Sequence, residues 1–226
     1  MLYKALKIIV RIAIRFFCRK IVINKPELLK AKGPLLLACN HPNSFLDSVI
    51  INTLFEQPVW SLARGDVFKK PFYIRLLSAL KILPVYRTSE GVENLSENYK
   101  TFEACIDIFK MNGIVTIFSE GKCINEWHLR PLKKGTARLA YKAWEEGIPL
   151  QVLPVGINYS SFRRFGKNVF LNFGTMISRE DIQLASPDGI KFQAFNNILE
   201  KQLKELVFEI PVNDKKLQRE KLKITQ

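Results

Sequence analysis

The sequence predicts a single α/β domain in which a largely parallel, mixed sheet is covered by helices on both faces, with an amphipathic helix at the N-terminus. Two observations lead to this fold. Short apolar or β-branched runs alternate along the chain with stretches of helical periodicity, which is the pattern of βαβ units. The chain also has 226 residues, about the size of one large domain, and no change in composition divides it.

The predicted strands are short and mostly apolar. The first is Leu-Leu-Leu-Ala-Cys at residues 35–39, and such a run is typical of a strand buried on both faces of a sheet. Further strands are expected at 59–63, 82–86, 114–118, 152–157 and 168–173. Helices are expected between and after them, at 44–55, 71–80, 93–111, 135–146 and 189–208.

Three segments follow from charge and hydrophobicity. Residues 1–32 are predicted to form the amphipathic helix and a connector with a short helical stretch at 26–30, before Gly33 and Pro34 interrupt the chain. Residues 33–210 are predicted to form the domain. Residues 211–226 are predicted to form a charged tail.

The first twenty residues are apolar but carry six Lys or Arg side chains, so they match neither a spanning helix nor a cleavable signal peptide. On a helix, one stripe contains Lys4, Lys7, Arg11 and Arg15. The opposite face contains Leu2, Leu6, Ile9, Val10, Ala13, Phe16 and Phe17. Such a helix either lies in the interface of an anionic bilayer or packs on the core of its own domain, and we favour the interfacial position.

The charge of the chain is strongly basic, because 35 Lys and Arg against 21 Asp and Glu give a net charge of +14. This excess predicts a polyanionic partner: nucleic acid, an acidic membrane surface or a phosphorylated substrate. The hydrophobic content of 47% excludes a disordered chain. The four cysteines, at 18, 39, 105 and 123, show no metal-ligand spacing with one another or with the two histidines, so reduced thiols and no metal are expected.

The sharpest candidate site directly follows the strand at 35–39 and reads Asn-His-Pro-Asn-Ser-Phe-Leu-Asp, residues 40–47. Ligands of open α/β sheets bind at the carboxyl ends of the strands, where this segment is expected. If His41 lies in the loop and Asp47 in the first helical turn, the carboxylate can orient the imidazole, and His41 can act as a general base toward a hydroxyl. A structural interpretation stays open, because Ser44 and Asp47 also have the spacing of a helix capping box.

Three further segments place charge or glycine at the end of a strand or the start of a helix. Arg87 ends one predicted strand, where it can bind a phosphate or form an ordinary surface ion pair. Glu120 and Gly121 follow another strand, and the glycine permits close approach of the backbone to a ligand. Lys133 and Lys134 precede a helix whose N-terminal N–H groups also favour anions.

In their order along the chain, these blocks resemble the glycerolipid acyltransferase family that includes the 1-acyl-glycerol-3-phosphate acyltransferases. The matching blocks, within residues 35–157, are Asn40-His41 with Asp47, Pro84-Val85-Tyr86-Arg87, Phe118-Ser119-Glu120-Gly121, Pro131-Leu132-Lys133-Lys134-Gly135 and Val152-Leu153-Pro154-Val155. Two departures stand out. His41 and Asp47 are separated by five residues, one more than usual, and Ser119, Lys122 and Cys123 replace the Pro, Thr and Arg of the usual Phe-Pro-Glu-Gly-Thr-Arg.

The resemblance implies transfer of a fatty acyl group from acyl-CoA or acyl carrier protein to a hydroxyl of a lysophospholipid, with 1-acyl-glycerol-3-phosphate as the expected acceptor. Glycerol 3-phosphate and a lyso-lipid without phosphate are the alternative acceptors. His41 and Asp47 are implied as the catalytic pair, with no cofactor or metal beyond the thioester co-substrate. The implied substrate-binding residues are Asn40, Arg87, Glu120, Gly121, Lys122, Lys133 and Lys134.

The expected partners are an anionic membrane surface, the acyl-thioester donor and the lyso-lipid acceptor, and the expected location is peripheral, or monotopic, on the cytoplasmic face of the cell membrane. Nucleic acid is not expected as a partner, because much of the clustered charge lies in the first helix and the tail and no nucleic-acid motif is present. The other alternative is a lipid-binding protein with an inactive site, since the His-Asp spacing departs from that of the family.

Overall fold

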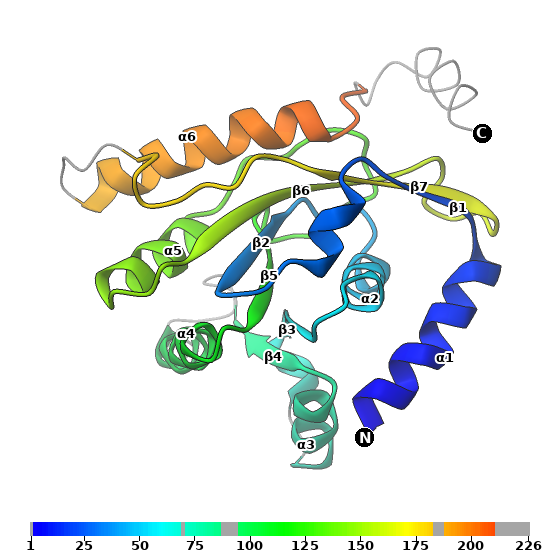
Figure 1. The fold of residues 1–226 in the computed structure, drawn as a ribbon, viewed down its shortest axis with the longest axis horizontal. Helices are drawn as coiled ribbons and strands as arrows, with labels where there is room; N and C mark the ends of the chain where they lie inside the picture. The colour runs from blue at the N-terminus through cyan, green and yellow to red at the C-terminus, as the bar shows by residue number, and fades with distance from the viewer. Residues whose placement is uncertain (1, 69–70, 87–94, 183–187, 211–226) are drawn as a thin grey trace.

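The structure, a computed structural model, describes residues 2–68, 71–86, 95–182 and 188–210. These residues form a seven-stranded sheet in the order β1-β7-β6-β2-β5-β3-β4 (Figure 1). Neighbouring strands are parallel except β6 and β7, which are antiparallel. The largely parallel, mixed sheet predicted from the sequence is confirmed.

The elements agree closely with the predicted ranges. The strands are β1 Cys18–Ile23, β2 Leu35–Cys39, β3 Val59–Arg64, β4 Ile82–Val85, β5 Ile114–Phe118, β6 Gln151–Tyr159 and β7 Lys167–Phe173. The α-helices are α1 Leu2–Phe17, α2 Phe45–Leu54, α3 Pro71–Ala79, α4 Leu95–Lys110, α5 Gly135–Glu145 and α6 Asp188–Leu206. Two short 3-10 helices are η1 Pro26–Lys30 and η2 Gly65–Phe68.

Strand β1 is the element that the sequence prediction gets wrong. The prediction places the first twenty residues in the helix and 21–32 in a connector, whereas α1 ends at Phe17 and Cys18–Ile23 pairs in parallel with β7. This pairing joins residues far apart in the chain, such as Val22 and Phe170. Because the partner strand supplies the stabilising contacts, periodicity within the segment alone does not reveal the strand.

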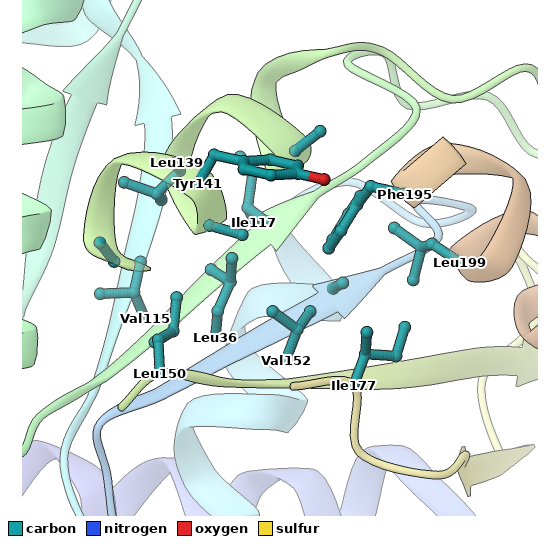
Figure 2. Packing of buried hydrophobic residues seen from close by; sticks show 14 of the residues in the cluster. Leu36, Val115, Ile117, Leu139, Tyr141, Leu150, Val152, Ile177, Phe195 and Leu199 are labelled. Carbon is teal, nitrogen blue, oxygen red and sulfur yellow. The ribbon is translucent and has the colours of Figure 1, made fainter. Parts of the chain in front are cut away.

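The sheet has a hydrophobic core on each face, and β2 contributes to both because successive side chains point to opposite faces. Leu36 lies in the core under α4, α5 and α6, together with Val115 and Val152 (Figure 2). The next residue, Leu37, lies in the other core with Ile50 of α2. Helices therefore cover both faces, with α4, α5 and α6 on one side and α1 and α2 on the other (Figure 1).

Helix α1 packs against the second core through Val10, Ile14 and Phe17. A different set of side chains on the same helix is exposed: Ile8, Ile9, Ile12 and Phe16 keep 63%, 60%, 54% and 74% of their surface accessible. Of the apolar face predicted from the sequence, Val10 and Phe17 pack on the domain and Ile9 and Phe16 are exposed, whereas Ile8, Ile12 and Ile14 lie outside that predicted face. Packing on the domain and an exposed apolar surface coexist in this helix.

Two cations of the predicted stripe on α1 are used within the domain. Lys7 Nζ donates hydrogen bonds to the carbonyl oxygens of Phe55 and Glu56, and Arg11 Nη2 donates to the carbonyl oxygen of Thr53 at 2.8 Å. The last carbonyls of a helix lack partners within it and attract cations, so these bonds fix α1 to the C-terminal end of α2.

Among the described helices, none is both long enough and apolar enough to cross a membrane.

Candidate active site

The candidate site begins where β2 ends. Asn40, 5% exposed, accepts a hydrogen bond from the backbone N–H of Ile157 at 2.7 Å and donates one to the carbonyl oxygen of the same residue at 3.0 Å. The side-chain amide therefore replaces a backbone partner of β6 just beyond the last paired residue of β2. Asn40, predicted to bind substrate, has its amide engaged in holding the start of the loop in place.

His41 is the next residue, and its imidazole is held from two sides. Nδ1 lies 2.9 Å from Oδ2 of Asp47, and the ring stacks on Phe118 with centroids 3.9 Å apart and an interplanar angle of 14°. The contact that the sequence predicts between His41 and Asp47 is present. Because Nδ1 faces the carboxylate, Nε2 is the ring nitrogen left to act on a ligand.

Asp47 lies in the first turn of α2 and is fully buried. Besides Nδ1 of His41, its carboxylate accepts the backbone N–H of Asn43 at 2.8 Å and the hydroxyl of Tyr159 at 2.6 Å. Burial, together with the charge of Asp47, raises the pKa of Tyr159 well above its ordinary value, so the phenol stays protonated and donates. Three donors compensate the burial of this carboxylate and fix its orientation.

The capping box proposed as a structural alternative is not formed. Ser44 is the N-cap residue of α2, but its side chain makes no capping hydrogen bond, and Asp47 accepts the N–H of Asn43 instead. Ser44 has a φ of 49°, and its N–H donates to Sγ of Cys123 at 2.8 Å. The longer spacing between His41 and Asp47 is thus accommodated in the loop, and the side chains still meet.

Glu120 follows β5, next to β2 in the sheet, and is 5% exposed. Its Oε1 accepts the backbone N–H of His41 at 3.4 Å. Burial raises the pKa of Glu120 to about 7, although the N–H of His41 and the charge and backbone N–H of Arg130 act to lower it. A buried carboxyl that titrates near neutral pH thus lies directly beside the histidine loop, a feature typical of functional sites.

Comparison with known protein families gives a match over most of the domain. The family model described as Acyltransferase matches residues 20–158, which is more than half of the chain. The match includes His41, Asp47 and Glu120 and ends one residue before the end of β6. The chain belongs to the acyltransferase family. The family indicated by the sequence blocks is confirmed, and the protein is an acyltransferase enzyme.

Among solved structures, this acyltransferase is similar to the 1-acyl-sn-glycerophosphate (LPA) acyltransferase PlsC from Thermotoga maritima. The TM-score is 0.62 at 20% sequence identity, and the similarity covers 90% of this chain and 77% of that one. At this identity, the likeness establishes a common fold. A comparison with curated protein sequences finds no match.

Gly121 and Lys122 follow Glu120 in this acyltransferase, and Lys133 lies over the same loop. Gly121 has a φ of +68°, and a Cβ there would lie 3.0 Å from Cγ of Lys133, so the stem of that lysine passes directly over the glycine. Lys122 is exposed in the same loop, and Lys133 and Lys134 are exposed just before α5. The structure therefore brings Lys133 to the Glu-Gly loop.

Ser119 stands where the family usually has proline, and the structure gives it a role that proline lacks. Its N–H donates to the carbonyl oxygen of Cys39 at 2.8 Å, and its hydroxyl accepts from Thr136 at 3.0 Å. The carbonyl oxygen of Ser119 accepts the N–H of Lys133 at 2.7 Å. Proline has no N–H, so the replacement adds a bond between the ends of β5 and β2.

Arg87, predicted to bind the acceptor phosphate, lies outside the described residues. The preceding residue, Tyr86, is fixed by Asn98 of α4: the backbone N–H of Tyr86 donates to Oδ1 of Asn98 at 2.8 Å, and Nδ2 of Asn98 donates to the carbonyl oxygen of Tyr86 at 2.7 Å.

The cysteines and metal-ligand residues show no second centre in the described part of the chain. Cys18, Cys39 and Cys105 are buried free thiols, and Cys123 is partly exposed. Burial raises the pKa of Cys123, so this sulfur is a thiol at neutral pH. Over the same residues, no three His, Cys, Asp or Glu side chains form a metal-binding group.

Two residues that contribute to the site were not predicted from the sequence. Tyr159, at the end of β6, donates to Asp47, and Arg130 lies near Glu120 with a buried Nη1 that has no hydrogen-bond partner among the described residues. Tyr159 acts across a long sequence separation, whereas Arg130 lies in the same connection between β5 and α5 as Glu120. The only local signal was the position of each residue at a strand end or in a basic loop.

Proposed function

We propose that this acyltransferase moves a fatty acyl group from a thioester, acyl-CoA or acyl carrier protein, to a hydroxyl of a lysophospholipid, with 1-acyl-glycerol-3-phosphate as the acceptor. The observation that carries the proposal is the 2.9 Å contact between His41 Nδ1 and the buried carboxylate of Asp47 at the carboxyl end of β2. Glu120 contacts the backbone of His41, and Lys133 lies over the adjoining Gly121. The PlsC-like fold supports the same reaction class.

In the proposed reaction, Nε2 of His41 takes the proton of the acceptor hydroxyl as its oxygen attacks the thioester carbonyl carbon. A C–O bond forms, the C–S bond breaks, and the proton passes from His41 to the leaving thiolate. Asp47 holds the imidazole with Nδ1 protonated and stabilises the imidazolium while the proton is on the ring. No covalent acyl-enzyme is required.

We assign phosphate binding to Arg87, Lys133 and Lys134, with Lys122 supplying further positive charge. Lys133 crosses Gly121, and the N-terminal end of α5 directly follows Lys134. A lysine ammonium and helix N–H groups both favour a phosphate. We assign the glycerol hydroxyls of the acceptor to Glu120.

We further propose that the enzyme works as a peripheral, monotopic protein on the cytoplasmic face of the cell membrane. The outward side chains of α1, Ile8, Ile9, Ile12 and Phe16, are supported as the contact because an exposed apolar ridge flanked by cations binds an anionic interface. The lyso-lipid acceptor would then reach the site from the bilayer.

The test uses the purified full chain with radiolabelled acyl-CoA or acyl carrier protein thioester. The acceptors are 1-acyl-glycerol-3-phosphate, glycerol 3-phosphate, and a monoacylglycerol as the lyso-lipid without phosphate. The expected result is preferred acylation of 1-acyl-glycerol-3-phosphate. Acceptor-independent release of thiol, or no transfer with any acceptor from either donor, contradicts the proposal.

A further inference from the structure

The turn between β6 and β7, residues 160–166, has a firmly held base. The carbonyl oxygen of Phe162 accepts a hydrogen bond from Nδ2 of Asn43 at 3.3 Å, and its ring packs on Trp127 with centroids 4.4 Å apart. The N–H of Arg164 donates to the hydroxyl of Ser161 at 3.2 Å. The turn is therefore joined directly to the loop that carries His41.

The tip of this turn is exposed and combines two cations with an aromatic ring. Arg163 and Arg164 are exposed, and Phe165 keeps 72% of its surface accessible. Neither guanidinium has an ion-pair partner within the part of the chain that the structure describes. An exposed Arg-Arg-Phe tip on a rigid base is unexplained by the packing of the domain.

The tip lies beside the C-terminal end of α1. The N–H of Gly166 donates to the carbonyl oxygen of Phe17 at 3.0 Å, and the rings of Phe165 and Phe17 meet edge to face at 5.7 Å. Figure 1 shows the turn and this end of α1 together at one end of the sheet. Neighbouring Phe16 is 74% exposed, so the apolar ridge of α1 continues toward Phe165.

The charged side chains of α1 and of the turn at 160–166 are all positive. Neither α1 nor the turn contains an acidic residue, and Arg15 joins Arg163 and Arg164 as exposed cations. Near the histidine loop, Phe45 is also 74% exposed. An acidic carrier protein would match the cations alone, whereas an anionic bilayer matches both the cations and the exposed Phe and Ile side chains.

We propose that Arg163, Arg164 and Phe165 form a second anchor on an anionic bilayer, beside α1. The arginines bind lipid phosphates, and Phe165 enters the interface. Two anchors fix the rotation of the domain, which one helix alone leaves free, and so direct the His41 loop toward the membrane. The orientation of the His41 loop toward the membrane rests on the proposed function, whereas the anchoring of the turn does not.

The test measures binding of the full chain to vesicles of phosphatidylcholine with and without phosphatidylglycerol, in the absence of substrate. The variants are Arg163→Gln with Arg164→Gln, and Phe165→Ser. The matched controls are Arg138→Gln with Lys201→Gln, on the helices of the opposite face, and Met111→Ser, which is 74% exposed at the amino end of β5.

We expect the double arginine variant to bind anionic vesicles about 25-fold more weakly, about 5-fold for each arginine, with added salt reducing the difference. Phe165→Ser is expected to bind about tenfold more weakly. The controls should bind like the parent chain. If the turn variants bind vesicles more weakly than the parent chain and none of the proteins transfers acyl groups, the anchor stands while the proposed function fails.

Two results overturn the anchor. The first is unchanged vesicle binding by both turn variants. The second is unchanged vesicle binding with a selective loss of acyl transfer from acyl carrier protein, which would assign the turn to the carrier protein instead.

Discussion

The hydroxyl of Tyr159 lies 2.6 Å from Oδ1 of Asp47, on the opposite side of the carboxylate from His41. Tyr159 and Asp47 are both fully buried, and they come from different elements, Tyr159 from β6 and Asp47 from α2. This bond completes the hydrogen bonding of the carboxylate, so it fixes the group that in turn orients the imidazole. Tyr159 is therefore a positioning residue for the proposed general base.

Replacing Tyr159 by phenylalanine tests this role. Tyr159→Phe leaves Oδ1 of Asp47 without its donor in a dry environment, so the free energy of unfolding should fall by about 1 to 3 kcal/mol. Because the imidazole is then less firmly oriented, kcat should fall while KM for the acceptor changes little. Urea unfolding and steady-state kinetics check the two effects. A stability loss with an unchanged kcat would leave Tyr159 with a structural role alone.

The pH dependence of stability should report on Glu120. Its pKa rises from 4.5 to about 7 on folding, mainly through burial. At low pH the carboxyl is protonated in both states and contributes nothing. As the pH rises from 4.5 to 7 the unfolded chain loses this proton first, so the wild type loses stability over that window, and above 7 the deficit is constant.

Glu120→Gln removes this deficit because the amide does not ionise. The variant and the wild type should therefore have the same free energy of unfolding near pH 4. Near pH 8 the free energy of unfolding of the variant should be higher by at most about 3 kcal/mol. Denaturant unfolding at both pH values measures it, with Glu205→Gln on the exposed side of α6 as the control. An equal difference at both pH values would show that Glu120 is not the group that titrates.

Gly121 offers a matched pair with Gly147. Both have a positive φ, +68° and +75°, but a Cβ at Gly121 meets Lys133 at 3.0 Å, whereas one at Gly147 meets nothing within 4 Å. Alanine should cost about 1 to 2 kcal/mol of stability at either position through backbone strain. Only Gly121→Ala should also raise KM for the phosphorylated acceptor, because it displaces Lys133. Equal acceptor kinetics in the two variants would remove Lys133 from the phosphate site.

The cations of α1 should separate into two functional pairs. Lys7 and Arg11 bind carbonyl oxygens at the end of α2, whereas Lys4 and Arg15 are exposed. Lys7→Met with Arg11→Met should lower the free energy of unfolding by about 1 to 3 kcal/mol, and Lys4→Met with Arg15→Met should leave it unchanged but weaken binding to anionic vesicles. Unfolding and vesicle sedimentation of both variants check this, and the opposite assignment would show that α1 faces the domain differently.

Much of the fold was accessible from the sequence because it is encoded locally. The run at 35–39 is apolar at every position, as a strand buried on both faces must be, and it forms β2 with the predicted limits. Strand β1 was missed for the opposite reason. Its segment has no alternation of burial, since Arg19 and Lys20 are exposed and Ile21 to Ile23 are half-buried in succession, and only pairing with β7 makes it a strand.

The candidate site also has contacts that the sequence predicts and contacts that it does not. The contact between His41 and Asp47 could be predicted because both residues lie within one loop and the first turn of the following helix. The contribution of Arg130 could not, because the irregular connection between β5 and α5 brings it near Glu120, and that of Tyr159 could not, because it depends on which strand ends lie side by side. The engagement of the Asn40 amide with Ile157 has the same cause, since it requires β2 and β6 to be neighbours.

The most direct test of the account compares the wild type with His41→Ala in acyl transfer from acyl-CoA to 1-acyl-glycerol-3-phosphate, with far-UV circular dichroism and vesicle binding measured on both. We predict that transfer falls by about 10² to 10⁴-fold, the usual contribution of a general base, while secondary structure and vesicle binding stay the same. Transfer by His41→Ala at a rate close to that of the wild type would contradict the assignment of His41 as the base.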